Sequence, residues 1–179
     1  TSDVVNIVNT ATGTNTFDTN NDVFETINLV AFSTTADPTI VTGAYSLGTP
    51  AGTGVLTING AGLGVGNVVT ITGTDAATPM SITTGISADD ITLGTKADTI
   101  VSGAGNDSIT VTAGANNITA GDGVDTVTLG TGAETIDMGA GNDIITAGGN
   151  LANTDIIDGV AGTDTLTTTT GITSASVMG

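Results

Sequence analysis

The chain has 179 residues, and its 18 Asp and Glu residues stand against one Lys, no Arg and no His, which gives a formal charge of −17 at pH 7. Nucleic-acid binding needs Lys and Arg to neutralise phosphates, and only Lys96 is present, so no nucleic-acid partner is expected. No apolar run approaches the roughly 18 residues of a membrane-spanning helix, so direct membrane insertion is not expected either. Without His and Cys, the ligands left for a metal are carboxylates, hydroxyls and backbone carbonyls, and these hard oxygen donors suit Ca²⁺.

Residues 1–83 are expected to form a β-rich N-terminal region without a strict period. Short strands are expected at residues 25–32, 55–60 and 68–73, where apolar and polar residues alternate between turn-forming residues. Only four residues of the chain are aromatic and no helical pattern competes, so an all-β fold with an aliphatic core is expected. Ile82 already fits the register of the repeat that follows, so the repeat architecture is expected to begin before residue 84.

Two short motifs in this region resemble other ligand sites, and both are incomplete. Residues 18–22 (DTNND) have the opening spacing of an EF-hand loop, but Val23 stands where that loop requires glycine, so an ordinary polar loop is favoured. Residues 62–66 (GLGVG) resemble a dinucleotide-binding loop, but the third glycine spacing, the following helix and the downstream acid are missing.

Residues 84–167 divide into nine consecutive rows, eight of nine residues and one of 12 residues at 147–158. Two of the clearest rows are residues 102–110 (SGAGNDSIT) and 138–146 (MGAGNDIIT). When the positions of a row are numbered as columns one to nine, column six is Asp, Glu or Asn in every row. Column eight is aliphatic in every row, and its residues are Ile91, Ile100, Ile109, Ile118, Val127, Ile136, Ile145, Ile157 and Leu166.

Each row is typical of a glycine-rich turn followed by a short strand. Glycines in columns two to four allow the unusual backbone angles of a tight turn. In the strand, column eight points inward while columns seven and nine point outward. A single row cannot bury its own aliphatic residue, so the rows are expected to coil and stack on one another.

This pattern resembles the RTX calcium-binding β-roll, whose consensus is GGxGxDxUx with U aliphatic. The resemblance covers about half of the chain and implies a right-handed parallel β-roll, or β-solenoid, over residues 84–167, followed by a tail at residues 168–179. It also implies that two rows make one turn and that alternate rows stack on the same edge. Several Ca²⁺ ions would then lie between stacked turns, held by column-six side chains and glycine carbonyls.

Sorting the rows by parity gives two edges, which we name the first and the second edge. The first edge keeps the family pattern. The second edge departs from it, because Lys96 replaces a turn glycine and the last row is longer, so this edge is expected to bind Ca²⁺ weakly, partly or not at all. The candidate ligands of the first edge are Asp89, Asp107, Asp125, Asp143 and Asp164 with Gly103, Gly105, Gly121, Gly123, Gly139 and Gly141, and those of the second edge are Asp98, Asn116, Glu134 and Asp155.

Electrostatic repulsion makes a cation necessary at the first edge. Stacked strands lie about 4.8 Å apart, so neighbouring carboxylates would repel by roughly 3 kcal/mol per pair at an effective dielectric constant near 20. A column of such carboxylates is not expected to stack without a cation. Folding is therefore expected to depend on Ca²⁺.

Two further patterns have simpler explanations than the functions they resemble. Every first-edge row ends in Thr, as in ice-binding surfaces, but column seven is irregular, so ordinary exposed strand threonines are favoured. The pairs Asp89–Asp90 and Asp122–Asp125 resemble glycosidase carboxylates, yet the repeat explains them, and the chain has no Trp and one Tyr for stacking on sugars. No enzymatic activity is expected.

Three non-catalytic functions remain, and the favoured one is a structural protein that folds on Ca²⁺ and self-assembles outside the cell into a surface layer or filament. Type I secretion is expected from the resemblance. Residues 2–6 repeat the strand pattern of the last row, so the N-terminal strand is expected to extend the ladder of a second copy, with Val5 and Ile7 in the aliphatic column. The alternatives are a calcium-rigidified module of an RTX adhesin and the secretion and folding module of an exported RTX enzyme.

Overall fold

The computed structural model describes residues 4–8, 26–30, 39–41, 55–74, 78–169 and 176–178. All regular structure in these residues is β-strand, which confirms the all-β prediction. In the same part of the chain there is no helix long and apolar enough to cross a membrane. The EF-hand-like residues 18–22 lie outside the described residues.

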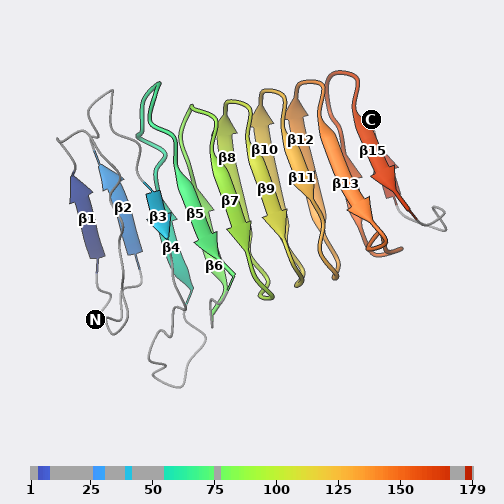
Figure 1. The fold of residues 1–179 in the computed structure, drawn as a ribbon, viewed down its shortest axis with the longest axis horizontal. Coiled ribbons are helices and arrows are strands. Elements are labelled where there is room, and N and C mark those ends of the chain that lie inside the picture. Colours follow the sequence, from blue (N-terminus) through green and yellow to red (C-terminus); the bar gives the residue numbers. More distant parts are fainter. Residues whose placement is uncertain are drawn as a thin grey trace.

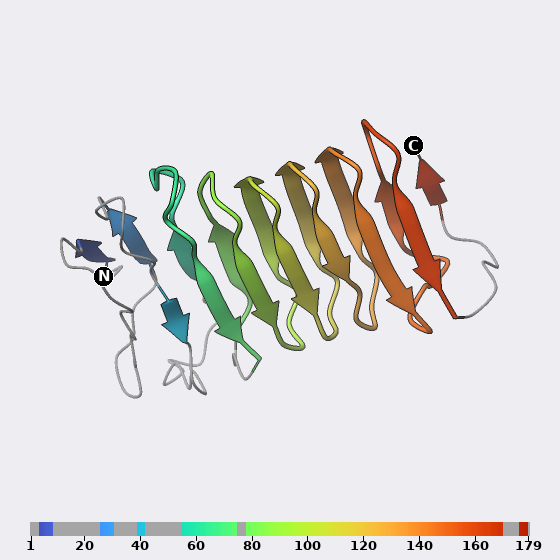
Figure 2. The ribbon, with the colours of Figure 1, turned by 45° about the horizontal axis from the view of Figure 1, so that its top comes forward.

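The strands form two parallel sheets and stand side by side along the long axis of the molecule (Figure 1; Figure 2). Sheet A contains, in order, β1 (Val4–Val8), β2 (Thr26–Val30), β4 (Leu56–Asn59), β6 (Met80–Thr83), β8 (Thr99–Ala104), β10 (Asn117–Asp122), β12 (Thr135–Ala140), β14 (Ile156–Asp158) and β16 (Ser176–Met178). Sheet B contains β3 (Thr39–Val41), β5 (Thr70–Gly73), β7 (Asp90–Leu93), β9 (Ser108–Val111), β11 (Thr126–Thr128), β13 (Ile144–Gly148) and β15 (Thr165–Thr168).

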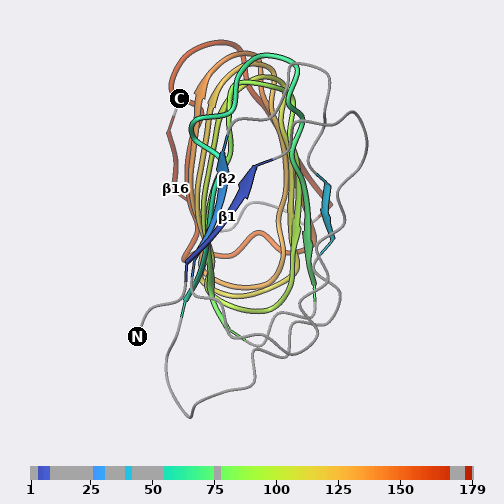
Figure 3. The ribbon, with the colours of Figure 1, turned by 90° about the vertical axis from the view of Figure 1, so that its left-hand side faces the viewer.

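From β2 onward, successive strands alternate between the two sheets, so the chain coils into a parallel β-solenoid. Seen end-on, the two sheets form opposite sides of a flattened coil (Figure 3). In sheet A, Ile100 pairs with Ile118, and Ile118 pairs with Ile136, so two nine-residue rows make one turn, as predicted. The turns from sheet A to sheet B carry the first edge, and the turns from sheet B to sheet A carry the second edge.

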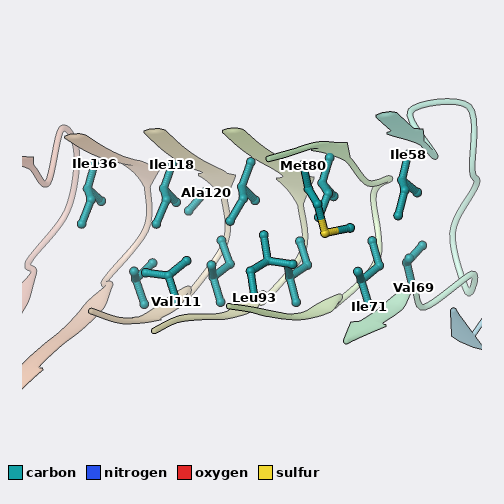
Figure 4. Packing of buried hydrophobic residues seen from close by; sticks show 14 of the residues in the cluster. Ile58, Val69, Ile71, Met80, Leu93, Val111, Ile118, Ala120 and Ile136 are labelled. Carbon is teal, nitrogen blue, oxygen red and sulfur yellow. The ribbon is translucent and has the colours of Figure 1, made fainter. Parts of the chain in front are cut away.

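The core is a double column of aliphatic side chains between the sheets. Ile58, Met80 and Ile118 come from one side, and the facing row on the other side includes Val69, Ile71 and Val111 (Figure 4). The predicted column-eight residues from Ile91 to Ile157 are all buried, and only Leu166, in the last described turn, is partly exposed. Column-seven residues of the same strands are mostly exposed, which confirms the predicted alternation.

The N-terminal region contributes strands to the same two sheets. The strands predicted at residues 25–32, 55–60 and 68–73 correspond to β2, β4 and β5. Ile82 in β6 pairs with Ile100 in β8, so the solenoid begins before its calcium-type rows, as predicted. Sheet A therefore continues across residue 83, and that boundary separates two kinds of turn within one solenoid.

The two terminal strands of the described chain both belong to sheet A. β1, which was predicted to extend another chain's ladder, pairs with β2 of its own chain, and its Val5 and Ile7 lie opposite Ile27 and Leu29. β16, which lies in the region predicted as a tail, pairs with β14. Sheet A thus ends on β1 at one end and on β16 at the other.

Candidate metal centre

The acids of the first edge form a continuous hydrogen-bonded ladder. Each one lies directly before a strand of sheet B, and all except the terminal Asp164 are buried. The Oδ1 atom of each acid accepts a hydrogen bond from the backbone N–H of the residue one turn earlier. The donors and acceptors are Val69 to Asp89 (2.7 Å), Asp89 to Asp107 (2.8 Å), Asp107 to Asp125 (2.8 Å), Asp125 to Asp143 (2.9 Å) and Asp143 to Asp164 (3.0 Å).

The second carboxylate oxygen distinguishes the middle of this ladder from its start. The Oδ2 atoms of Asp107, Asp125 and Asp143 are buried and have no hydrogen-bond partner. In contrast, Oδ2 of Asp89 accepts a hydrogen bond from the Gly85 N–H (3.3 Å). A buried, unpaired carboxylate oxygen is costly, and three in successive turns form a column of negative charge that a hard cation fits.

The pKa values of the ladder acids reflect their burial. Burial, with a smaller contribution from neighbouring carboxylates, raises the pKa of both Asp89 and Asp125 from 3.8 to about 6. Burial also raises the pKa values of Asp107 and Asp143. The ionised ladder is therefore unfavourable as the protein alone presents it, and a cation would relieve it.

The predicted glycine ligands lie in the same turns as these acids. Gly121 and Gly123 have φ values of 112° and 148°, in the region that favours glycine. A Cβ atom on either residue would overlap the carbonyl oxygen of Gly103 or Gly105, one turn earlier. Glycine therefore lets the turns approach closely, and it stacks backbone carbonyls beside the carboxylates. The other two predicted glycines, Gly139 and Gly141, continue these two stacks in the next turn.

Two asparagines also link turns of the first edge, and the sequence reasoning did not identify them. The Asn106 Oδ1 accepts a hydrogen bond from the Val124 N–H, and the Asn142 Oδ1 accepts one from the Thr163 N–H, both at 2.9 Å. Both asparagines occupy column five, immediately before a ladder acid. The triplet Gly-Asn-Asp, which recurs in alternate rows of this edge at residues 105–107 and 141–143, could have indicated their role.

The second edge also carries buried column-six residues, but most of their polar atoms are satisfied by the protein. The N–H groups of Met80, Asp98 and Glu134 donate to Oδ1 of Asp98, Asn116 and Asp155 at 2.8, 2.9 and 3.1 Å. The Asn116 amide also donates to the Ala113 carbonyl (3.2 Å), and Oδ2 of Asp155 accepts from the Ala152 N–H (2.8 Å). This second set of bonds removes the need for a cation at Asn116 and Asp155.

Glu134 is the exception on the second edge. Its side chain is fully buried, and neither carboxylate oxygen has a hydrogen-bond partner. Burial, followed by the adjacent Asp155 carboxylate, raises the pKa of Glu134 from 4.5 to about 7. The two edges thus differ in the described residues, with three successive unpaired acids on the first and one on the second. This difference supports the prediction of unequal edges.

The donor set fits Ca²⁺ better than a transition metal. No group of three or more Asp, Glu, His or Cys side chains gathers anywhere in the part of the chain that the structure describes. A cation at either edge would therefore be held by one or two carboxylates together with glycine carbonyls, an all-oxygen set that suits Ca²⁺.

Comparison with known proteins agrees with this geometry. A family model of the RTX calcium-binding nonapeptide repeat (4 copies) matches residues 83–111, 110–145 and 128–150. Searches of curated proteins and of solved structures each gave no match. Residues 83–150 therefore consist of RTX calcium-binding nonapeptide repeats, and these repeats form a parallel β-solenoid.

Proposed function

We propose that this protein is a non-catalytic structural protein that folds on Ca²⁺ outside the cell and associates end to end into a filament or surface layer. The observation that carries the calcium dependence is the column of buried, unpaired Oδ2 atoms on Asp107, Asp125 and Asp143. When bound, Ca²⁺ supplies the positive charge and the flexible oxygen coordination that such a column lacks. The chain's own part is to hold the carboxylates at fixed spacing through the Oδ1 ladder.

The proposed requirement for Ca²⁺ in folding supports an extracellular location. RTX repeats are typical of extracellular proteins exported by type I secretion. Extracellular calcium modules bind with dissociation constants of about 10⁻⁴ to 10⁻³ M, so a chain of this kind can stay unfolded inside the cell and fold after export.

The ladder accounts for the carboxylate pairs that resemble those of glycosidases. Asp89 is buried in the ladder while Asp90 is exposed on the outer side of β7. Asp125 is fully buried while Asp122 is exposed at the end of β10. The buried member of each pair is bonded into the inter-turn ladder, and this structural use supports the non-catalytic part of the proposal.

End-to-end association is supported by the open ends of sheet A. Among the described strands, β1 and β16 each have one neighbour in the sheet, so within this part of the chain each presents an unpaired strand edge. Val5 and Val177 stand at the two ends of one register column that runs through Ile27, Ile58 and Ile157. Joining β16 of one copy to β1 of the next would continue this column. Because such a contact joins two different surfaces, repeating it gives an open filament unless the rotation between copies closes them into a ring.

Electron microscopy of the full chain in millimolar Ca²⁺ tests the assembly. We expect filaments or sheets from the intact chain and from a variant lacking residues 1–3, which retains β1. We expect loss of assembly from a variant lacking residues 1–8, with circular dichroism to verify that it folds. A strictly monomeric intact chain would refute the assembly, and normal filaments from the folded 1–8 deletion would refute the role of β1.

A further inference from the structure

The turns from β4 to β6, which directly precede the first ladder acid, have an apolar column six. Leu56, Val69 and Met80 occupy this column, each two residues before a buried isoleucine, and all three are buried. Met80 points toward the opposite sheet, as do Val69 and Ile71 (Figure 4). Residues 55–74 and 78–88 contain no Asp or Glu, so within these two stretches no carboxylates stack on one another.

Neutral hydrogen bonds join these turns to the ones that follow. The Ser87 Oγ accepts a hydrogen bond from the Gly66 N–H (2.9 Å), and the Thr84 hydroxyl donates to the Ser102 carbonyl (2.7 Å). The Leu63 N–H donates to the Gly60 carbonyl (2.9 Å), which closes the turn between β4 and β5. Because none of these bonds involves a charged group, they form equally well with or without a cation.

The ladder begins on this apolar segment at both edges. The Val69 and Met80 N–H groups donate to Oδ1 of Asp89 and Asp98, the first acids of the first and second edges, at 2.7 and 2.8 Å. The Gly85 N–H donates to the other oxygen of Asp89. Buried unpaired carboxylate oxygens begin one turn later, at Asp107. The need for a cation therefore starts after the first ladder turn.

We propose that the turns from β4 to β6 fold without Ca²⁺ and act as a template on which the calcium-dependent turns stack, from Asp89 toward the C-terminus. This inference rests on the proposed calcium dependence of the later turns. The template supplies two fixed backbone donors and an apolar surface for the first acid of each edge, so each added turn presents the next donor. Calcium-driven folding thus has a direction along the chain.

Hydrogen exchange of the full chain, followed by mass spectrometry at pH 7, tests the template. In the calcium-free chain, we expect amides of residues 56–83 to exchange at least about tenfold more slowly than those of residues 107–143. After Ca²⁺ is added, protection at residues 89–111 should precede protection at residues 135–158. Equal exchange of both segments without Ca²⁺, or simultaneous or reversed gain of protection, would overturn the proposal. Full protection of the whole chain without Ca²⁺ would instead refute the calcium dependence itself.

A matched pair of variants in β6 separates the template from general stability. Met80→Asp places a carboxylate in column six, whereas Ser81→Asp places the same charge on the outer face of the same strand. We expect the calcium-free protection of residues 56–83 to be lost in Met80→Asp and kept in Ser81→Asp. Protection that survives in Met80→Asp, or that is lost equally in both variants, would contradict the role assigned to the apolar column.

Discussion

The acids of the first edge differ in how many of their oxygens the protein itself satisfies. Asp125 has one oxygen bonded to the Asp107 N–H and one buried oxygen without a partner. Asp122 lies in the same row, but its side chain is exposed. The two residues therefore allow the same charge to be removed from a cation site and from the surface.

Replacing Asp125 with Asn keeps an oxygen for the Asp107 N–H but removes the charge and the unpaired oxygen. We expect the Ca²⁺ concentration at half-folding to rise by about tenfold or more in Asp125→Asn, because ligand charge sets affinity at such sites. Asp122→Asn should change it by less than about twofold, since surface charges contribute little. A calcium titration followed by circular dichroism measures both variants. Equal midpoints for the two would show that Asp125 does not hold a cation.

At the scale of the stacked strands, the ladder has a proton-dependent stability of its own. Burial raises the pKa values of Asp89 and Asp125 to about 6, above the 3.8 that applies in the unfolded chain. Between these values the folded chain binds more protons than the unfolded chain, so the stability of the calcium-free fold rises as pH falls from 7 through 6 toward 4. Below about pH 4 both states are protonated and the gain is complete.

The calcium-free chain should therefore regain strand structure on acidification. We expect circular dichroism of protein freed of Ca²⁺ by gel filtration to show more β structure at pH 5 than at pH 7. Raising NaCl at pH 7 is the control, because salt screens surface charges but acts little on buried ones. Identical spectra at both pH values, or an equal recovery in salt, would contradict buried carboxylates as the cause.

The repeat could be predicted closely from the sequence because its determinants are local. Column eight alternates with exposed neighbours in every row, so the buried positions from Ile91 to Ile157 were predictable, while the two-row turn was implied by the resemblance to the RTX β-roll. The sequence did not predict that each acid accepts a hydrogen bond from the turn before it. The bond from the Asp107 N–H to Asp125 depends on the register between turns, which no local pattern specifies. The inter-turn role of Asn106 was missed for the same reason.

The apolar turns before residue 84 were harder to recognise because their rows are longer than nine residues. Leu56, Val69 and Met80 replace the acid of column six, so the most specific mark of the repeat is missing there. Only the register of Ile82 with the later rows indicated that the same solenoid continues into this region.

At the scale of the whole molecule, the acidic rows need a cation between their turns, and the ends of sheet A offer the surfaces for association with other copies. Every Asp and Glu in the described residues lies between Asp89 and Asp164, while the described strands nearer the N-terminus carry none. Over the full sequence six of the 18 acids precede Asp89, so charge does not distinguish the two ends, but the described strands do, because sheet A ends on β1 at one end and on β16 at the other. This asymmetry favours the polar filament over a symmetric dimer.

The central claim is that, at pH 7, the stacked first edge exists only with a cation between its turns. Far-ultraviolet circular dichroism of the full chain at pH 7, before and after removal of Ca²⁺, tests it most directly. We expect most of the strand signal to be lost cooperatively on removal, restored by Ca²⁺ and restored poorly by Mg²⁺, which demands a tighter octahedron and sheds water reluctantly. An unchanged spectrum after complete removal of Ca²⁺, verified by metal analysis of the protein, would contradict the claim.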